Sequence, residues 1–307
     1  MDKILCIGQA TCDITIPIDM EIKDNHKFTI HEEIIDCGGP AMTAACVCGK
    51  WGAETDLISR IGNDDTGKSI RDKLDFFSIN TGKLIIKHQY TTPYSYIFVN
   101  KNNGNRTIFN NPGNNNDIVQ CDVECAYKVI LTDGRDLDLS LKSFETNPDA
   151  KKIIDAGTYR ETTLALAKKT DYLICSKYFA EQYTNMVIDT DLHNICEVFK
   201  AVENINNAIA IITLGNRGLV FRDSDEKIKI FPAYQVKTVD TTGAGDIFHG
   251  AFAWAISKEL NYFEAIKFAV ITASMSTRSI GGQESIPDLR DVLQVNEQWK
   301  PETVICS

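Results

Sequence analysis

The residues with the clearest chemical potential lie in the sequence VDTTGAGDIF, residues 239–248. Apolar residues follow it at helical spacing, so the GAGD segment is expected at a helix N-terminus, where free amides and a positive dipole favour an anion. Gly243, Ala244 and Gly245 carry almost no side chain, so their N–H groups can approach a phosphate closely. Asp246 would repel that phosphate unless it accepts a proton, as a general base does. The alternative is a capping Asp on an ordinary buried helix.

Three further segments accompany this motif. Residues 4–8 read as a buried strand that leads to Asp13, residues 37–45 as a diglycine turn running into a helix of small residues, and residues 211–221 as strand, glycine turn and strand. In this order and spacing, and with the TTGAGD motif, they resemble the PfkB/ribokinase family of carbohydrate kinases. The resemblance extends over residues 4–287.

The resemblance implies an α/β, ribokinase-like fold, with a mainly parallel central sheet flanked by helices and a small β-sheet lid. A single kinase domain is expected over residues 1–307, with the lid formed by about residues 12–36 and 88–110. The implied activity is an ATP-dependent carbohydrate kinase, which transfers the γ-phosphoryl group to a monosaccharide hydroxyl and uses Mg²⁺ with its ATP.

Residue roles follow from the same resemblance. Asp246 matches the catalytic base, and the GAG amides match an anion hole for the transferring phosphoryl group. The residues expected to bind the sugar are Asp13, Gly38, Gly39, Thr43 and Arg106. Those expected to bind the nucleotide are Thr213, Gly215, Gly218 and Thr242. Many members bind a monovalent cation such as K⁺, largely through backbone carbonyls, at positions that match Asp240, Thr242, Gly281 and Ser285.

Two departures from the family pattern concern ligand contacts. Thr43 stands where the family often has Asn, so one hydroxyl replaces a carbonyl and an amide. Residues 176–179, SKYF, stand where many members have an Asn-x-x-Glu motif that organises magnesium. Neither departure changes the residues around Asp246.

A rival phosphate-binding motif occurs at residues 62–69, GNDDTGKS, which satisfies the Walker A pattern. Asp64 and Asp65 would place two carboxylates inside a loop that must wrap a polyphosphate, with Lys68 as the only nearby cation. The same stretch fits a Gly-Asn-Asp turn of the sugar-kinase family. We therefore favour the turn.

The surrounding pattern predicts the elements that position these residues. Strand-like residues 152–155 and 172–175 flank a helical stretch, residues 161–170, and this alternation favours a parallel sheet. Alternating residues 14–20, and a hairpin signal with strands at 94–99 and 106–109, predict the small lid. An apolar face on that lid must be covered, so a homodimer through the lid is a hypothesis.

Composition bounds the function class. The chain has 307 residues and a formal net charge of −10, without a basic run, which argues against nucleic acid and anionic membranes as partners. No signal peptide or membrane-spanning run is recognised. The ten cysteines lack metal-ligand spacing and are expected to be reduced core thiols. A cytoplasmic location is therefore expected.

Several polar residues receive a structural interpretation. Asp155 and Arg160 are expected to form an exposed ion pair at a strand end, although in some family members this stretch contacts an acidic sugar. His249 lies one helical turn after Asp246, and we expect it to be structural. A solvated Lys177 is favoured over one that touches the nucleotide phosphates.

Two alternative functions remain open. A nucleoside kinase of the same family would need an apolar or aromatic wall for the base, which Tyr94, Tyr96 and Phe98 could supply. A sensing protein with the kinase fold and no turnover is supported only by the missing Asn-x-x-Glu motif, and the intact TTGAGD motif argues against it.

Overall fold

The short apolar segments of the sequence form strands in the computed structural model, which describes residues 3–101, 106–114, 121–124 and 126–306. The strands are β1 (Ile4–Ile7), β2 (Thr11–Ile18), β3 (Ile34–Gly38), β4 (Thr55–Ile58), β5 (Arg60–Gly62), β6 (Ile85–Lys87), β7 (Tyr94–Asn100), β8 (Arg106–Asn111), β9 (Val129–Thr132), β10 (Lys151–Ala156), β11 (Tyr172–Ser176), β12 (Ile209–Thr213), β13 (Leu219–Arg222), β14 (Ile228–Phe231) and β15 (Val304–Ile305).

The helices carry the longer amphipathic or buried segments. They are α1 (Pro40–Lys50), α2 (Asp65–Phe76), α3 (Leu137–Thr146), α4 (Glu161–Ala167), α5 (Lys177–Thr184), α6 (Ile195–Glu203), α7 (Ala244–Ser257), α8 (Tyr262–Ser276) and α9 (Leu289–Gln298), with short 3₁₀ turns η1 (Thr81–Lys83), η2 (Gly215–Arg217) and η3 (Gln283–Ser285).

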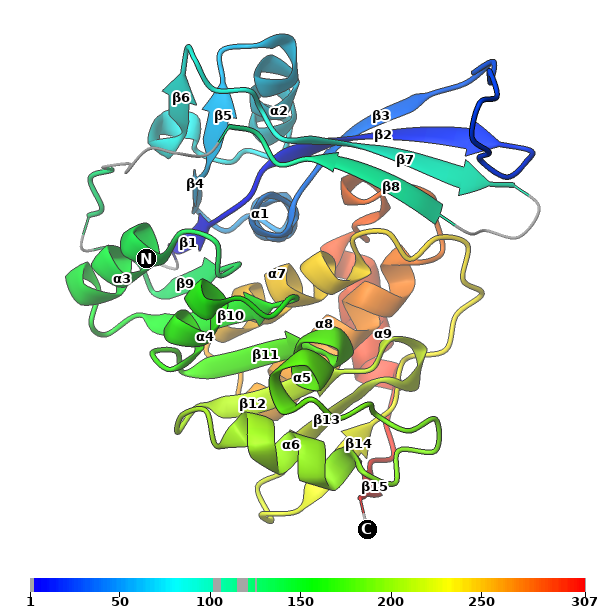
Figure 1. Ribbon diagram of the computed structural model, residues 1–307. Coiled ribbons are helices and arrows are strands. Elements are labelled where there is room, and N and C mark those ends of the chain that lie inside the picture. The colour runs from blue at the N-terminus through cyan, green and yellow to red at the C-terminus, as the bar shows by residue number, and fades with distance from the viewer. Residues whose placement is uncertain (1–2, 102–105, 115–120, 125, 307) are drawn as a thin grey trace.

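A nine-stranded sheet forms the centre of the molecule, in the order β15-β14-β13-β12-β11-β10-β9-β1-β4 (Figure 1). The strands from β4 to β12 in this order are parallel, and β13, β14 and β15 add antiparallel strands at one side. Strands such as β1, β4 and β9 are buried along their whole length, as a parallel sheet covered on both faces requires. The carboxyl ends of the parallel strands therefore meet at one edge, where ligands bind in open α/β sheets.

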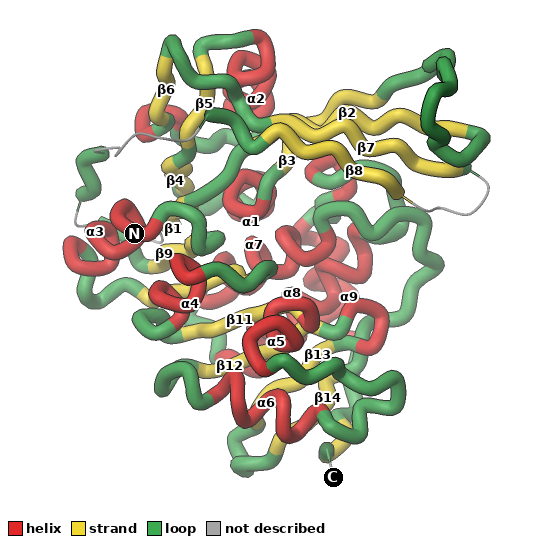
Figure 2. The backbone as a smooth tube through the Cα atoms, viewed as in Figure 1, coloured by secondary structure: helices red, strands yellow, loops and turns green. Residues whose placement is uncertain are grey.

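Helices cover both faces of this sheet (Figures 1 and 2). One core packs α1, α7 and α8 against the sheet and includes Met42, Phe252 and Phe268. The other packs α3, α4, α5 and α6 on the opposite face and includes Phe179 and Phe199. The predicted α/β architecture, with a mainly parallel central sheet flanked by helices, is confirmed.

A separate four-stranded sheet, in the order β3-β2-β7-β8, stands beside the carboxyl edge of the central sheet (Figures 1 and 2). The β2 strand pairs antiparallel with β3 and parallel with β7, and β7 pairs antiparallel with β8. We call this the small sheet. A third, two-stranded sheet joins β5 and β6.

Among the described residues, no helix combines the length and apolar character needed to cross a membrane.

Candidate functional site

The TTGAGD segment forms the start of α7, as its sequence predicts. Gly243 is the N-cap residue and adopts φ +70°, a left-handed conformation that glycine reaches without strain. No side chain caps this helix end. The Ala244 amide donates to the Thr241 carbonyl at 3.3 Å, and the Ile247 amide makes the first bond of the helix, to the Gly243 carbonyl at 2.8 Å. Amides in the first turn of a helix lack a carbonyl partner within it, which makes a helix start suitable for an anion.

A cavity of about 380 Å³, which we call the acceptor cavity, opens on one side of this helix start. Gly243 and Asp246 line it from α7, the small sheet supplies Asp13, and the loop before η3 supplies Gly281. The remaining sugar-binding candidates with described side chains also line it: Gly38, Gly39 and Thr43.

A second cavity of about 330 Å³, the donor cavity, opens on the other side of the same segment and is lined by Ala244 and Gly245. Thr213, Gly215 and Gly218 line it, as expected of nucleotide-binding residues. Its lining also includes apolar residues, which suit contact with a flat heterocycle. These are Leu219, Val236, Phe248, Val270 and Ala273.

The position of Thr242 differs from the nucleotide-binding role expected for it. Its side chain lines the acceptor cavity, whereas the neighbouring Thr241 lines the donor cavity. The Thr242 hydroxyl donates to Asp240 Oδ1 at 2.8 Å, so this side chain turns toward the Asp240 carboxylate.

Acidic groups gather beneath the helix start. Burial, together with the charge of nearby Asp155, raises the pKa of Asp246 to about 8. Asp155 is 6 % exposed, and its own pKa is raised to about 7 by burial and by Asp133. The expected exposed Asp155–Arg160 ion pair is therefore wrong. Parallel pairing places the ends of β9 and β10 side by side, which buries Asp155 near Asp133 instead.

His249 supports this cluster without contacting the acceptor cavity. Its Nδ1 donates to the Gly245 carbonyl at 2.7 Å and lies 3.3 Å from Asp155 Oδ2. Burial lowers the pKa of His249, so the ring is neutral near pH 7 with its proton on Nδ1. This arrangement agrees with a structural role.

Of the four candidate residues for a monovalent cation, Asp240, Thr242 and Gly281 line the acceptor cavity, and Ser285 contacts the neighbouring Gly282. Asp240 Oδ2 accepts from the Gly281 amide at 3.2 Å, and Asp240 Oδ1 accepts from the Thr242 amide at 3.0 Å. Ser285 donates to the Gly282 carbonyl at 2.7 Å. Oxygen donors of this kind suit a hard monovalent cation. By contrast, the described residues contain no cluster of three or more His, Cys, Asp or Glu side chains able to hold a metal ion.

The segment in place of the Asn-x-x-Glu motif is a helix cap. Ser176 accepts from the Phe179 amide at 3.0 Å and donates to the Gly157 carbonyl at 2.8 Å. The nearby Glu181 accepts from the Ile188 amide at 2.8 Å. Lys177 lies 3.4 Å from Glu181 and donates to the Ile188 carbonyl at 3.2 Å, so its ammonium group has protein partners and is not fully solvated.

The Walker-like segment is a capped turn, as favoured from its sequence. Asp64 is the N-cap of α2, and its carboxylate accepts from the Gly67 amide at 2.7 Å and from the Thr92 amide at 2.9 Å. A carboxylate thus occupies the position in which a P-loop would bind phosphate.

Two other sequence expectations concern the small sheet. The side chain of Arg106 lies outside the described residues, although its backbone pairs with Val99. The aromatic wall expected of Tyr94, Tyr96 and Phe98 is wrong. Strand alternation turns Ile97 and Val99 of β7 toward the acceptor cavity and the three aromatic rings toward the opposite face.

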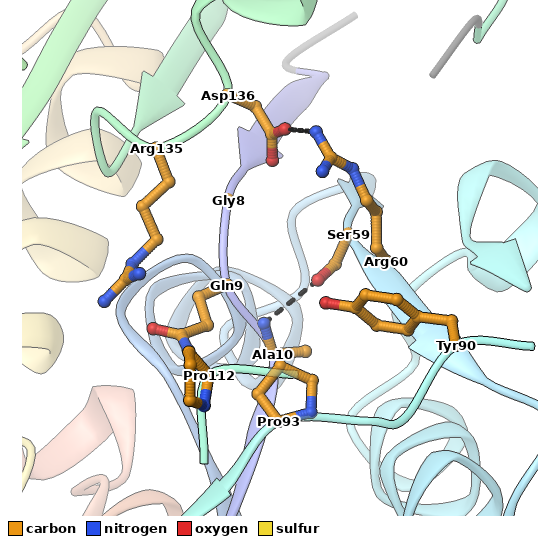
Figure 3. A pocket seen from close by; sticks show the side chains of 10 residues that line it. All are labelled: Gly8, Gln9, Ala10, Ser59, Arg60, Tyr90, Pro93, Pro112, Arg135 and Asp136. Carbon is orange, nitrogen blue, oxygen red and sulfur yellow. Dashed lines mark hydrogen bonds and ion pairs between the residues drawn. The ribbon is translucent and has the colours of Figure 1, made fainter. Parts of the chain in front are cut away.

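A third cavity, close to the base of the small sheet, is too small to hold a sugar, at about 40 Å³ (Figure 3). An Arg60–Asp136 ion pair closes one side, and the Ala10 amide donates to Ser59 Oγ at 3.0 Å. Figure 3 shows Arg135 on the other side of the Gly8 strand end from this pair. We assign these contacts to holding the strand ends together.

Asp36, Asp133 and Asp155 belong to this site and were not selected as site residues from the sequence. Asp36 lines the acceptor cavity and comes directly before the diglycine turn. Asp133 accepts from the Gln9 amide at 2.7 Å, beside the end of β1. Their positions in the sequence could have indicated them, because Asp133 directly follows β9, Asp155 lies in β10 and Asp36 lies in β3.

Comparison with known proteins gives consistent results. The family model of pfkB family carbohydrate kinases matches residues 1–289. A nucleoside kinase from Methanocaldococcus jannaschii is 25% identical over 318 residues, covering 98% of each chain. A ribokinase from Lactococcus lactis is 27% identical over 306 residues, covering 95% of this chain and 96% of the relative.

A solved structure shows the same fold. Arabidopsis thaliana ribokinase, complexed with ribose and ATP, superposes with a TM-score of 0.82 at 20% identity, covering 96% of this chain and 98% of that chain. Both the fold and the enzyme class expected from the sequence are therefore confirmed. Because the matching family model spans almost the entire sequence, the chain belongs to the pfkB family of carbohydrate kinases.

Proposed function

We propose that this protein is an ATP-dependent sugar kinase that transfers the γ-phosphoryl group to a monosaccharide hydroxyl. One observation carries the proposal: the acceptor and donor cavities meet at the first turn of α7. Asp246 faces the acceptor side, and Ala244 and Gly245 face the donor side. Phosphoryl transfer needs this placement of a base and an anion hole on either side of the transferred group.

The proposed reaction is a single displacement. The acceptor oxygen attacks the γ-phosphorus, its proton passes to the Asp246 carboxylate, and ADP leaves from the donor cavity. Amides at the start of α7 stabilise the charge on the transferring group. No described carboxylate lines the donor cavity, so Mg²⁺ is expected to be carried by the ATP phosphates, whose charge it balances.

The Asp240–Ser285 corner is proposed to bind K⁺. A cation there would lie beside Gly281 and Gly282, which line the acceptor cavity next to the start of α7. Its positive charge would offset the acidic groups of the site. We therefore expect faster turnover in KCl than in NaCl of equal ionic strength.

The test is a coupled ADP-release assay with Mg-ATP across pentoses, hexoses, ketoses, acidic sugars and nucleosides, each run with K⁺ and with Na⁺. Saturable turnover on a monosaccharide is the expected result. Turnover on nucleosides alone would replace the sugar with a nucleoside, which the similar M. jannaschii relative makes a serious alternative. Ligand binding without any turnover would instead support a sensing protein.

The small sheet is proposed to act as a lid, inserted in a single kinase domain, and to join two copies of the chain. Ile35, Ile14, Tyr96 and Phe109 pair in one row across it, on the face opposite the acceptor cavity. Ile35 is 58% exposed, Phe109 55% and Tyr96 40%. An uncovered apolar row on a sheet is typical of an interface.

A charge in this row is expected to separate the two copies. Light scattering at micromolar concentration should give twice the mass of one chain for the wild type and a single-chain mass for Ile35→Glu combined with Phe109→Glu. Val187→Glu serves as the matched control, because Val187 is 75% exposed outside the small sheet. A wild type that remains monomeric would rule out this assembly.

A further inference from the structure

A second carboxylate faces the acceptor cavity from the small sheet. The β2–β3 register pairs Asp36 directly with Asp13, and both residues line the cavity. The same row continues through Ser95 of β7 to Asn110 of β8. Because directly paired residues point to the same face, the row places four polar side chains side by side.

The neighbouring row on the same face is mostly aliphatic. It pairs Ile34 with Thr15, Ile97 and Ile108. Of these four, Ile34, Thr15 and Ile97 line the cavity. The small sheet therefore presents one polar row, able to bind hydroxyl groups, and one row suited to the apolar face of a ring.

Asp36 is held in a fixed orientation. Its Oδ1 accepts from the Cys37 amide at 2.9 Å and lies 3.2 Å from Lys73 Nζ of α2. The same ammonium lies 3.1 Å from Glu284 of η3. Lys73 thus ties β3 to the segment that follows Gly281 and Gly282.

The second oxygen of Asp36 is available to a ligand. Within the described residues, Oδ2 has no hydrogen-bond partner, and it would lie 3.8 Å from a Cβ added at Gly281 in the facing loop. The Oδ2 atom of Asp36 therefore faces Gly281 on the opposite wall of the cavity. Lys73, which contacts Oδ1, balances the charge of the carboxylate.

The negative charge of the acceptor cavity limits the kinds of acceptor that can bind there. Four carboxylates line it, those of Asp13, Asp36, Asp240 and Asp246, and its described lining contains neither Lys nor Arg. A carboxylate or phosphate on the acceptor would be repelled by these four carboxylates. Hydroxyl groups, which can donate hydrogen bonds, suit this lining.

We propose that Asp36 is an acceptor-binding residue that, together with Asp13, receives hydrogen bonds from two hydroxyls of a neutral polyol. This pair selects neutral acceptors against those carrying a carboxylate or phosphate. Lys73 is the positioning residue that holds Asp36. The proposal rests on the proposed sugar-kinase function, but binding of a sugar can be measured whether or not it is phosphorylated.

The test uses isothermal titration calorimetry on the full chain, with D-ribose, D-fructose, D-gluconate and ribose 5-phosphate as probes. The wild type should bind at least one neutral sugar and show no binding of the two anions at the same concentration. Asp36→Asn removes a charge-assisted acceptor, so we expect its Kd for that neutral sugar to rise by about tenfold or more, with ATP binding unchanged.

Two further variants distinguish the positioning role of Lys73 from a general loss of folding. Lys73→Met should also weaken sugar binding and leave ATP binding unchanged. Glu284→Gln removes the other partner of Lys73, whose side chain is 73% exposed, and should behave as the wild type. Thermal unfolding of each variant verifies that it is folded.

Each outcome decides the proposal. An Asp36→Asn protein that is folded and binds the neutral sugar with wild-type Kd would overturn it, as would a wild type that prefers gluconate or ribose 5-phosphate or binds neither neutral sugar. Sugar binding without ADP release would refute the kinase function alone. In that case the Asp36→Asn comparison still decides the role of Asp36.

Discussion

Replacing Asp246 with Asn is expected to lower kcat for the sugar by about 10²–10⁴, the usual range for loss of a general base. Asn keeps the shape of the side chain at the start of α7 but cannot accept the hydroxyl proton. Ala244 and Gly245, which line the donor cavity, are unchanged. Nucleotide binding should therefore remain within about threefold of wild type, and ADP release with a saturating sugar measures the loss.

The same substitution is expected to stabilise the fold at alkaline pH. The pKa of Asp246 is raised from 3.8 to about 8, so ionisation disfavours the folded state. The stability associated with the protonated carboxyl is present at low pH and is lost as pH rises through about 8. At pH 8.5 the Asn variant should thus unfold at higher temperature, and a gain of about 1 kcal/mol would raise Tm by roughly 2 °C.

Asp65→Asn is the matched control, because Asp65 is an exposed acidic residue in the first turn of α2. Its kcat should equal that of the wild type. An Asp246→Asn enzyme with near-normal turnover would assign the base to another group, and Asp155, the neighbouring carboxyl, would be tested next.

The sequence was sufficient for the architecture and for the helix start and glycine turn at which the transfer site is proposed, because these depend on local patterns. The GAGD segment had to begin a helix, since glycines precede an apolar helical repeat. The turn at Gly215 and Gly218 had to join two strands. Such features are read within about ten residues of chain, and α7 begins at the predicted position.

The remaining site residues depend on pairing between distant segments. Asp36 faces Asp13 only because β2 and β3 pair in one particular register, and a shift by one residue would turn it to the opposite face. In the same way, the alternation of side chains along β7 turns Tyr96 away from the cavity and Ile97 toward it. Asp155 was expected in an exposed ion pair because it stands at a strand end close to Arg160 in the sequence, whereas its neighbours in space are Asp133 and His249.

The clustering of acidic groups also predicts how activity depends on pH. The base must be ionised to accept a proton, and burial with the charge of Asp155 raises the pKa of Asp246 to about 8. We therefore expect kcat/KM for the sugar to fall as pH decreases below about 8, approaching a tenfold loss per pH unit. Between pH 9 and pH 6 the total loss should be on the order of a hundredfold.

The fall of kcat/KM toward low pH forms the acidic limb of the pH profile, and the pH at which this limb lies should depend on the neighbours of Asp246. Their titrations are coupled, so the apparent pKa belongs to the group formed by Asp13, Asp133, Asp155, Asp246 and His249. Asp155→Asn removes a negative charge that opposes ionisation of Asp246, and the limb should move to lower pH. Asp149→Asn makes the same change at an exposed turn before β10 and should leave the limb in place. If the wild-type profile were flat from pH 6 to pH 9, or if both variants shifted it equally, the limb could not be assigned to Asp246, because only a base inside this cluster responds to Asp155 alone.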